Sequence, residues 1–322
     1  MKTLYLHIGP HKTGSTYIQQ ELFKHREKLF EQGVLYPDSM LEMYGHTGLA
    51  TAVKSGDLSA YRQELNDVNS FAGDVILSSE NFYNMTQDQI SLLRQVLHFD
   101  DVKIIIYYRQ PTIRLLSVWH EYVKSGITQS YPEFANRHLA RPFISDELNI
   151  KRKIDDYLQV FSAASVHVVD YEKAVSSQST LSSFFEAIGQ SMPFLEKWTS
   201  VNARIDFLDL EVLRSLHYLS VAGPLRGHQL RIRFLAHRDK YLDLLACSVF
   251  PAMERAMDQY VVGASFVDRA LLDTINKAYS GSVDESRPLS SEDVRIPKSL
   301  WLLDEDAATA MRFIYADLVA GA

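Results

Sequence analysis

Apolar runs alternate with helical patterns along the first half of the chain. Short runs that are typical of buried strands each precede a stretch with helical spacing of its apolar residues. The strand-like runs cover residues 3–8, 74–79, 102–108 and 165–171, and the helical patterns that follow them cover residues 15–31, 86–97, 111–124 and 180–188. This alternation predicts an α/β fold with a mainly parallel central sheet flanked by helices.

Beyond about residue 190 the pattern becomes helical. Residues 206–219 and 268–279 have helical spacing, and the polar stretch 280–293 is typical of an exposed loop. No internal repeat or clear linker interrupts the chain. We therefore predict a single domain over residues 1–322, with an α/β core of about residues 1–190 and a helical C-terminal part of about residues 191–322.

The residues after each predicted strand are the first candidates for function, because ligands of such sheets bind at the carboxyl ends of the strands. The first strand leads into "HIGPHKTGST", residues 7–16. Gly9 and Gly14 have the spacing of a nucleoside-triphosphate loop, but Ser15 stands where that loop has lysine, and Lys12 lies inside the turn. Such a turn directs backbone N–H groups and the positive end of a helix dipole at an anion. Glycine-containing turns of this kind also occur without a ligand.

A second candidate anion site follows the most apolar strand, in "YYRQPTIRLLSVW". Arg109 ends the strand, Pro111 suits the first turn of a helix, and Ser117 lies eight residues beyond Arg109. A cation at a helix start is disfavoured by the dipole, and a bound anion would offset that cost. The alternative is an exposed arginine that points away.

Together these two segments resemble the sulfotransferases that use 3′-phosphoadenosine 5′-phosphosulfate, of the bacterial carbohydrate or metabolite type with a P-loop-like fold. The resemblance covers about residues 1–190, including "VVDYEKA" at the fourth strand. It implies that the core binds this nucleotide as co-substrate, without a metal. The residues that would hold it are His11, Lys12, Thr13, Gly14, Ser15 and Thr16 for the 5′-phosphosulfate, and Arg109 and Ser117 for the 3′-phosphate. Lys12 would also be catalytic, stabilising charge on the bridging oxygen.

The acceptor hydroxyl needs a general base, and Glu80 is our first candidate. It follows the strand 74–79 at the carboxyl edge of the sheet, where related enzymes acting on sugars use a glutamate. The alternative role for Glu80 is a carboxylate that caps the following turn. His46 is the second candidate base, because histidine titrates near neutrality, and His11 is a weaker one. Glu172 is expected to accept hydrogen bonds from nearby amides, and Trp119 and Tyr122 to pack in the core.

The chain departs from the family in one respect. Many cytosolic members have a late Arg-Lys-Gly segment over the 3′-phosphate, and this tripeptide is absent. The densest basic stretch contains Arg226, Arg231, Arg233, Arg238 and Lys240. It is either a solvated helix face or a group that closes on the 3′-phosphate or attracts an anionic acceptor.

Composition limits the partners. The 322 residues carry a formal net charge of −7, which disfavours general attraction to nucleic acid or to an anionic membrane. One cysteine, Cys247, excludes a disulfide framework, and no apolar run is long enough for a bilayer. We expect a soluble cytoplasmic protein that acts on a small-molecule or glycan acceptor. Its oligomeric state and acceptor are open.

Two other functions fit the same residues. One is a P-loop kinase or NTPase with a degenerate loop, although the lysine after Gly14 is absent. The other is a non-catalytic nucleotide-binding protein of the same fold, which could retain Lys12 and Arg109.

Overall fold

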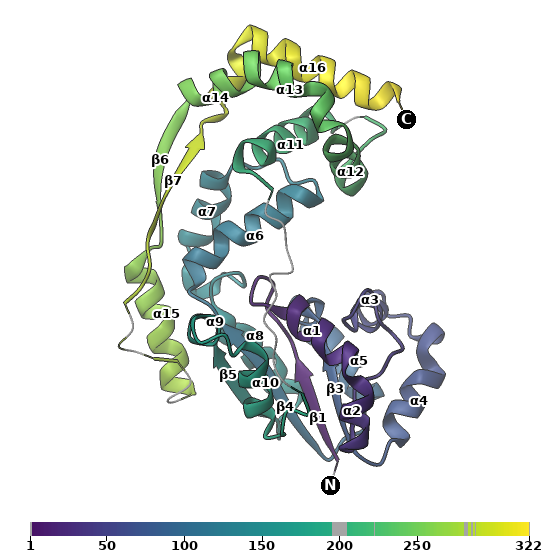
Figure 1. Ribbon diagram of the computed structural model, residues 1–322. Coiled ribbons are helices and arrows are strands. Elements are labelled where there is room, and N and C mark those ends of the chain that lie inside the picture. The colour runs from purple at the N-terminus through teal and green to yellow at the C-terminus, as the bar shows by residue number, and fades with distance from the viewer. Residues whose placement is uncertain are drawn as a thin grey trace. The chain divides into compact units, whose positions relative to one another are not determined.

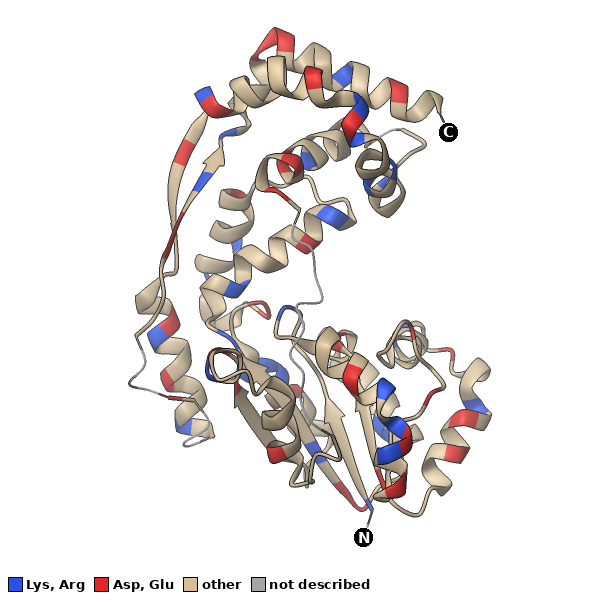
Figure 2. Cartoon of the chain, in the orientation of Figure 1, with Lys and Arg blue, Asp and Glu red and all other residues tan. Residues whose placement is uncertain are grey.

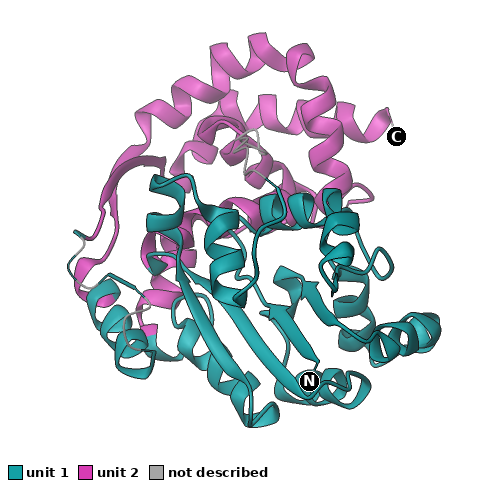
Figure 3. Ribbon diagram, turned by 60° about the horizontal axis from the view of Figure 1, so that its bottom comes forward, with its two compact units in different colours: residues 1–111, 143–201, 268–288 teal, residues 112–142, 202–267, 289–322 magenta. Residues whose placement is uncertain are grey.

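The computed structural model describes residues 2–194, 205–221, 223–279, 283–284, 286 and 288–321. Contacts within the chain divide it into two compact units, coloured teal and magenta in Figure 3. Unit 1 comprises Met1–Pro111, Phe143–Val201 and Asp268–Pro288, and unit 2 comprises Thr112–Pro142, Asn202–Val267 and Leu289–Ala322. The chain thus passes between the units several times, whereas we expected one change of character near residue 190. The single domain stays a prediction.

A five-stranded sheet forms the centre of unit 1 (Figure 1). All its strand pairs are parallel, and the strand order is β2-β3-β1-β4-β5. The strands are β1 (Thr3–His7), β2 (Val34–Leu35), β3 (Asp74–Ser78), β4 (Asp101–Tyr108) and β5 (Ser165–Asp170). The predicted α/β class and four of these strands are confirmed. β2 was not predicted, since two residues carry no readable pattern.

Helices cover both faces of this sheet, which explains why its strands are continuous apolar runs. On β1, Leu4 and Leu6 face one hydrophobic cluster, whereas Tyr5 faces the other. The first face is covered by α3 (Thr47–Ser55), α4 (Arg62–Ser70), α5 (Gln87–Val96), α8 (Ile150–Val160) and the part of α15 (Ser265–Ala278) that belongs to unit 1. The second face is covered by α1 (Ser15–Lys24), α2 (Arg26–Glu31) and α10 (Thr180–Ile188), and α9 (Tyr171–Ser176) follows β5.

Unit 2 is mainly helical, as expected for the C-terminal part of the chain. Its longer helices are α6 (Pro111–Ser125), α7 (Tyr131–Leu139), α11 (Phe207–Leu219), α12 (Gly227–His237) and α16 (Glu305–Ala320), with the shorter α13 (Leu242–Leu244) and α14 (Phe250–Arg255) between them. The apolar faces of α11, α12, α14 and α16 form one cluster around Leu213, Phe234 and Trp301. The unit also contains an antiparallel pair of strands, β6 (Met257–Val262) and β7 (Glu292–Pro297), which we did not predict.

Two further expectations need correction. The helical pattern over residues 15–31 forms two helices, because α1 ends at Lys24 and α2 begins at Arg26. No glycine or proline in the sequence marks this break. The polar stretch 280–293 lies partly outside the described residues, and its last two residues begin β7. Within the described ranges, no helix has the length and apolar character needed to cross a membrane.

Candidate functional site

The carboxyl ends of three neighbouring strands bring the candidate residues of unit 1 to one edge of the sheet. β1 is central and pairs with both β3 and β4, so that His7 is in register with Ser78 on one side and Ile105 on the other. The loop after β1, Glu80 after β3 and Arg109 after β4 therefore follow adjacent strands (Figure 1). The strand-end rule placed these three segments correctly.

The loop after β1 depends on residues with left-handed backbone geometry. Gly9 and Gly14 have φ values of +90° and +80°, which glycine adopts without steric cost. A Cβ on Gly9 would lie 3.0 Å from the Glu80 Cα, so glycine is also required for this close approach. Lys12 has a φ of +69°, an unusual value for a residue with a side chain. Such strain is concentrated at functional sites.

Helix α1 begins directly after this loop. Gly14 is its N-cap residue, and among the described residues no side chain caps it and no acidic residue lies in its first turn. The first turn thus retains the positive character that favours an anion. Ser15 is buried and Thr16 is half-buried. The hydroxyl of Thr13 is buried and donates to the Pro10 carbonyl oxygen at 2.6 Å, so it stabilises the loop itself.

Arg109 connects the two predicted anion-binding segments. Its Nη1 donates to the backbone carbonyl oxygen of Lys12 at 2.8 Å. Its guanidinium also lies over the Tyr171 ring, 5.2 Å from the ring centroid. Ser117 lies in the second turn of α6, within unit 2. Its pairing with Arg109 on a 3′-phosphate stays a prediction.

Two carboxylates hold the turn that contains Arg109. Glu172 Oε1 accepts a hydrogen bond from the Gln110 backbone N–H at 2.8 Å, which confirms the expected structural role of Glu172. The Gln110 side-chain amide donates to Asp268 Oδ2 at 2.7 Å, and Asp268 is fully buried. These bonds fix the backbone on the carboxyl side of Arg109.

Glu80 has a partly exposed carboxylate that faces the loop. The short 3₁₀ turn that it begins is capped by Ser79, whose hydroxyl accepts from the Asn81 N–H at 3.2 Å, so the Glu80 carboxylate is not the cap. Glu80 Oε2 instead accepts from Gln19 Nε2 at 2.9 Å, and Oε1 lies 4.0 Å from His11 Nδ1. The Glu80 side chain is 23% exposed, which leaves it accessible to a proton donor.

His46 is fully buried and engaged on both ring nitrogens. Its Nδ1 accepts from the Ser78 backbone N–H at 3.1 Å, which leaves Nε2 protonated to donate to the Pro37 carbonyl at 3.1 Å. Burial lowers its pKa to about 4. This arrangement favours a structural role over that of general base, and its catalytic assignment stays a prediction.

A second buried histidine, His7, supports the same end of the sheet. Its Nδ1 lies 2.7 Å from the Ser78 hydroxyl oxygen, and its backbone carbonyl accepts from the Ser79 N–H at 3.1 Å. Burial lowers the pKa of His7 to about 4, against the opposing effect of the Glu80 charge. His7 and His46 thus position the backbone of β3 just before Glu80.

The cations of the basic stretch have ion-pair or hydrogen-bond partners within unit 2. Arg238 pairs with Asp209 and Lys240 with Asp317, each at 2.6 Å, and Figure 2 shows both acidic and basic positions on the helices of unit 2. Arg231 donates to His228 Nδ1 at 2.6 Å, and Arg226 to the Gly223 carbonyl at 2.8 Å. These contacts favour the interpretation of the basic stretch as a solvated helix face over its interpretation as an anion site.

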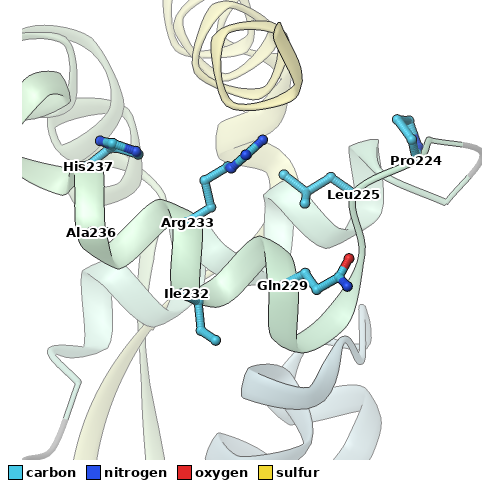
Figure 4. Close-up of a pocket in the computed structure, with 7 residues that line it drawn as sticks. All are labelled: Pro224, Leu225, Gln229, Ile232, Arg233, Ala236 and His237. Atoms are coloured by element: carbon cyan, nitrogen blue, oxygen red, sulfur yellow. The ribbon is translucent and has the colours of Figure 1, made fainter. Parts of the chain in front are cut away.

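Arg233, the fifth cation of this stretch, lies beside a surface cavity on α12. It points toward the C-terminal helix in Figure 4 and donates to the carbonyl oxygens of Leu318 and Gly321 at 2.7 and 2.8 Å. Arg233 therefore binds the C-terminal end of α16, where a cation interacts favourably with the helix dipole. The cavity measures about 530 Å³ and is lined by Pro224, Leu225, Gln229, Ile232, Arg233, Ala236 and His237.

The predicted packing roles of two aromatic residues are confirmed. Trp119 is fully buried, and its Nε1 donates to the Gln129 carbonyl at 2.9 Å. Tyr122 packs edge-to-face against Phe134, with ring centroids 5.7 Å apart. Both residues belong to unit 2.

Gln19 is the residue of this site that sequence reasoning missed. It contacts Glu80 from the second turn of α1, where it is 5% exposed among buried apolar neighbours. A polar residue on the buried face of a helix was the available signal. Within the described parts of the chain, no group of three or more His, Cys, Asp or Glu side chains is arranged to hold a metal ion.

Comparison with known proteins gives one structural similarity. The chain is similar to the crystal structure of a sulfotransferase from Alicyclobacillus acidocaldarius, with a TM-score of 0.39 and 16% sequence identity. The similarity covers 72% of this chain and 95% of that chain. No protein-family model and no curated protein matches the sequence. The functional assignment therefore depends on the residues described above.

Proposed function

We propose that the protein transfers a sulfuryl group from 3′-phosphoadenosine 5′-phosphosulfate to a hydroxyl group of a carbohydrate or another small metabolite. The observation that carries this proposal is the hydrogen bond from Arg109 to the Lys12 carbonyl. It joins two segments, 97 residues apart in sequence, each of which the sequence predicts to bind an anion. A donor with phosphate groups at both the 3′ and 5′ positions of its ribose needs two such segments side by side.

The residues at the carboxyl edge fit an extended anion. Gly14 is the N-cap residue of α1, and its left-handed φ of +80° is one that glycine adopts without steric cost. Backbone donors and the hydroxyls of Ser15 and Thr16 would hold the 5′-phosphate, and Lys12 adds a mobile positive charge. Arg109 would hold the 3′-phosphate.

Each residue has a defined task in the reaction. The phosphosulfate supplies the sulfuryl group, whose bond to the bridging oxygen breaks as its bond to the acceptor oxygen forms. Lys12 stabilises the negative charge that develops on the bridging oxygen, where a positioned cation is most effective. Glu80 accepts the acceptor's hydroxyl proton on Oε1, since Oε2 is engaged by Gln19. Positioning and charge stabilisation account for most of the rate enhancement in such transfers.

Calorimetric titration tests the donor specificity. We expect adenosine 3′,5′-bisphosphate to bind in the micromolar range or tighter, and ATP with magnesium to bind at least ten-fold more weakly. Binding of ATP with magnesium but not of the bisphosphate would support the degenerate kinase or NTPase and contradict our proposal. If the bisphosphate binds, labelled sulfate transfer to a panel of sugars and small alcohols distinguishes an enzyme from a nucleotide-binding protein.

A further inference from the structure

We infer that Gln19 is a positioning residue for the reaction: its side-chain amide fixes the Glu80 carboxylate and leaves Oε1 as the oxygen that takes the proton. This inference deepens the proposed function and rests on it for the role of Glu80. Its structural basis is the hydrogen bond from Gln19 Nε2 to Glu80 Oε2, at 2.9 Å.

The burial of Gln19 is the first argument. Its neighbours on α1 include Tyr17, Ile18 and Leu22, which are buried in the apolar layer beneath the helix. Gln19 itself is 5% exposed. Burying a primary amide is unfavourable unless the amide is hydrogen-bonded, and leucine at this position would fill a similar space without that cost. The amide is therefore best explained by its bond to Glu80.

The backbone at Gly45 restricts the Gln19 side chain. A Cβ at Gly45 would lie 2.7 Å from both Cδ and Oε1 of Gln19, closer than any side chain can approach. Gly45 is held in turn by backbone bonds, because its N–H donates to the Glu42 carbonyl at 3.3 Å and its carbonyl accepts from the Thr47 N–H at 2.7 Å. The amide thus packs against a fixed backbone surface, which limits its rotation and directs Nε2 at Glu80.

The chemical character of glutamine is the third argument. A lysine or arginine at this position would form an ion pair with Glu80 and strongly favour its ionised form. A neutral amide orients the carboxylate with one hydrogen bond and adds no net charge, so that the carboxylate keeps more of its basicity. Oε1 then continues to face His11, the residue that precedes Lys12 in the loop.

Other titratable groups also face Glu80, and they stay constant in the experiment. His11 approaches from the loop, with Nδ1 4.0 Å from Oε1. The Glu80 charge acts on His7 from β1, and it contributes to the raised pKa of Tyr36, whose main cause is burial. Because these three groups are unchanged by a substitution at Gln19, a change in the carboxyl resonance of Glu80 reports on the amide.

The test is the carboxyl-carbon resonance of Glu80, measured by nuclear magnetic resonance at neutral pH in protein labelled with ¹³C at glutamate and assigned with the variant Glu80→Gln. Gln19→Leu removes the hydrogen bond to Oε2 and should therefore shift this resonance. Gln19→Asn, whose amide is one methylene shorter, should shift it in the same direction if Gln19→Leu does not fold. Gln20→Leu is the matched control, because Gln20 is the next residue of α1 and is half-buried, and it should leave the resonance unchanged.

Turnover gives the second readout. In Gln19→Leu, kcat should fall about ten-fold with bisphosphate affinity within two-fold, because the base is less well oriented for proton transfer. An unchanged Glu80 resonance in the folded Gln19 variants would overturn the inference. The resonance measurement requires no turnover, so a wild-type protein that binds the bisphosphate but transfers no sulfate would overturn the proposed enzyme activity separately.

Discussion

The two units of the chain use their charged residues differently. In unit 1, Lys12, Arg109 and Glu80 follow the ends of adjacent parallel strands, and two further carboxylates hold the backbone around Arg109. In unit 2, the densest basic stretch of the sequence is paired with carboxylates and carbonyls of the same unit. The number of basic residues in a segment therefore does not by itself indicate an anion site. Our proposal rests instead on the positions of Lys12 and Arg109 after the ends of adjacent strands.

The largest expected effect is that of removing the cation from the loop of unit 1. Lys12→Ala should lower sulfate transfer about 1,000-fold or more, because charge on the bridging oxygen loses its stabilising partner. Labelled sulfate transfer measures this loss. Lys24→Ala is the control, since Lys24 is the last residue of α1, the helix that follows this loop, and its side chain is 58% exposed, so this variant should remain active. A Lys12→Ala enzyme within ten-fold of wild type would contradict the assignment.

In unit 2, the corresponding test concerns stability. Arg214 and Glu211 form a buried pair at 2.5 Å, and Trp301 Nε1 donates to the same Glu211 oxygen at 3.3 Å. Arg214→Met should destabilise unit 2 by about 3–5 kcal/mol, because Glu211 is left buried without its cation. Denaturant unfolding measures this change, and adding Glu211→Gln should recover part of it. If the folded Arg214→Met protein lost affinity for the bisphosphate, the contrast between the units would not hold.

The buried histidines of unit 1 predict a pH dependence of stability. The pKa of His7 and of His46 is about 4 in the folded protein, against an ordinary value near 6.5, because burial disfavours the charged ring. The unfolded chain binds more protons between these values, so each contribution is complete above pH 6.5 and is lost as the pH falls toward 4. Each histidine should account for about 3 kcal/mol.

The variant His46→Asn tests this pH dependence. Its stability should fall less steeply than that of wild type between pH 6.5 and 4, as measured by thermal unfolding at several pH values. His98→Asn is the control, because His98 is exposed. Parallel curves for wild type and His46→Asn would show that His46 does not contribute.

Removal of the proposed base should reduce turnover by about 100-fold. Glu80→Gln keeps the shape of the side chain but removes its capacity to accept the proton. Steady-state sulfate transfer measures kcat, and calorimetry should show bisphosphate affinity close to that of wild type. Normal turnover in this variant would contradict the assignment of Glu80 as the base.

The smallest expected effect concerns the basic stretch of unit 2. Arg231→Ala and Lys240→Ala should change bisphosphate affinity by less than about two-fold, because both cations have partners within their own unit. The exposed pair of Lys240 and Asp317 should contribute little to stability, because solvent screens it. A ten-fold loss of affinity in either variant would make this stretch part of the site after all.

Much of unit 1 was predictable because its signals are local. The strands β1, β3, β4 and β5 are continuous apolar runs, since helices cover both sheet faces. By contrast, β6 and β7 were missed because most of their residues are exposed or half-buried, which leaves no apolar alternation to read. The assignment of separate chain segments to each unit could not be predicted either, because it depends on contacts between segments distant in sequence.

The candidate site divides in the same way. The positions of Lys12, Glu80 and Arg109 at one edge followed from the rule for parallel sheets. The role of Gln19 and the burial of His46 did not, because both depend on which distant backbone packs against the side chain. The sequence alone does not distinguish a histidine that faces solvent from one that is buried.

The sequence by itself determined the α/β class, the main strands of the sheet and the sheet edge at which the candidate functional residues lie. These follow from local apolar patterns and from strand direction. The tertiary structure decided which polar side chains are buried and which groups they hydrogen-bond. It placed the Arg109 guanidinium on the Lys12 carbonyl, gave the Glu80 carboxylate an amide partner, and enclosed His46 between two backbone groups. Hydrogen bonding and burial depend on neighbours distant in sequence, so only the folded chain specifies them.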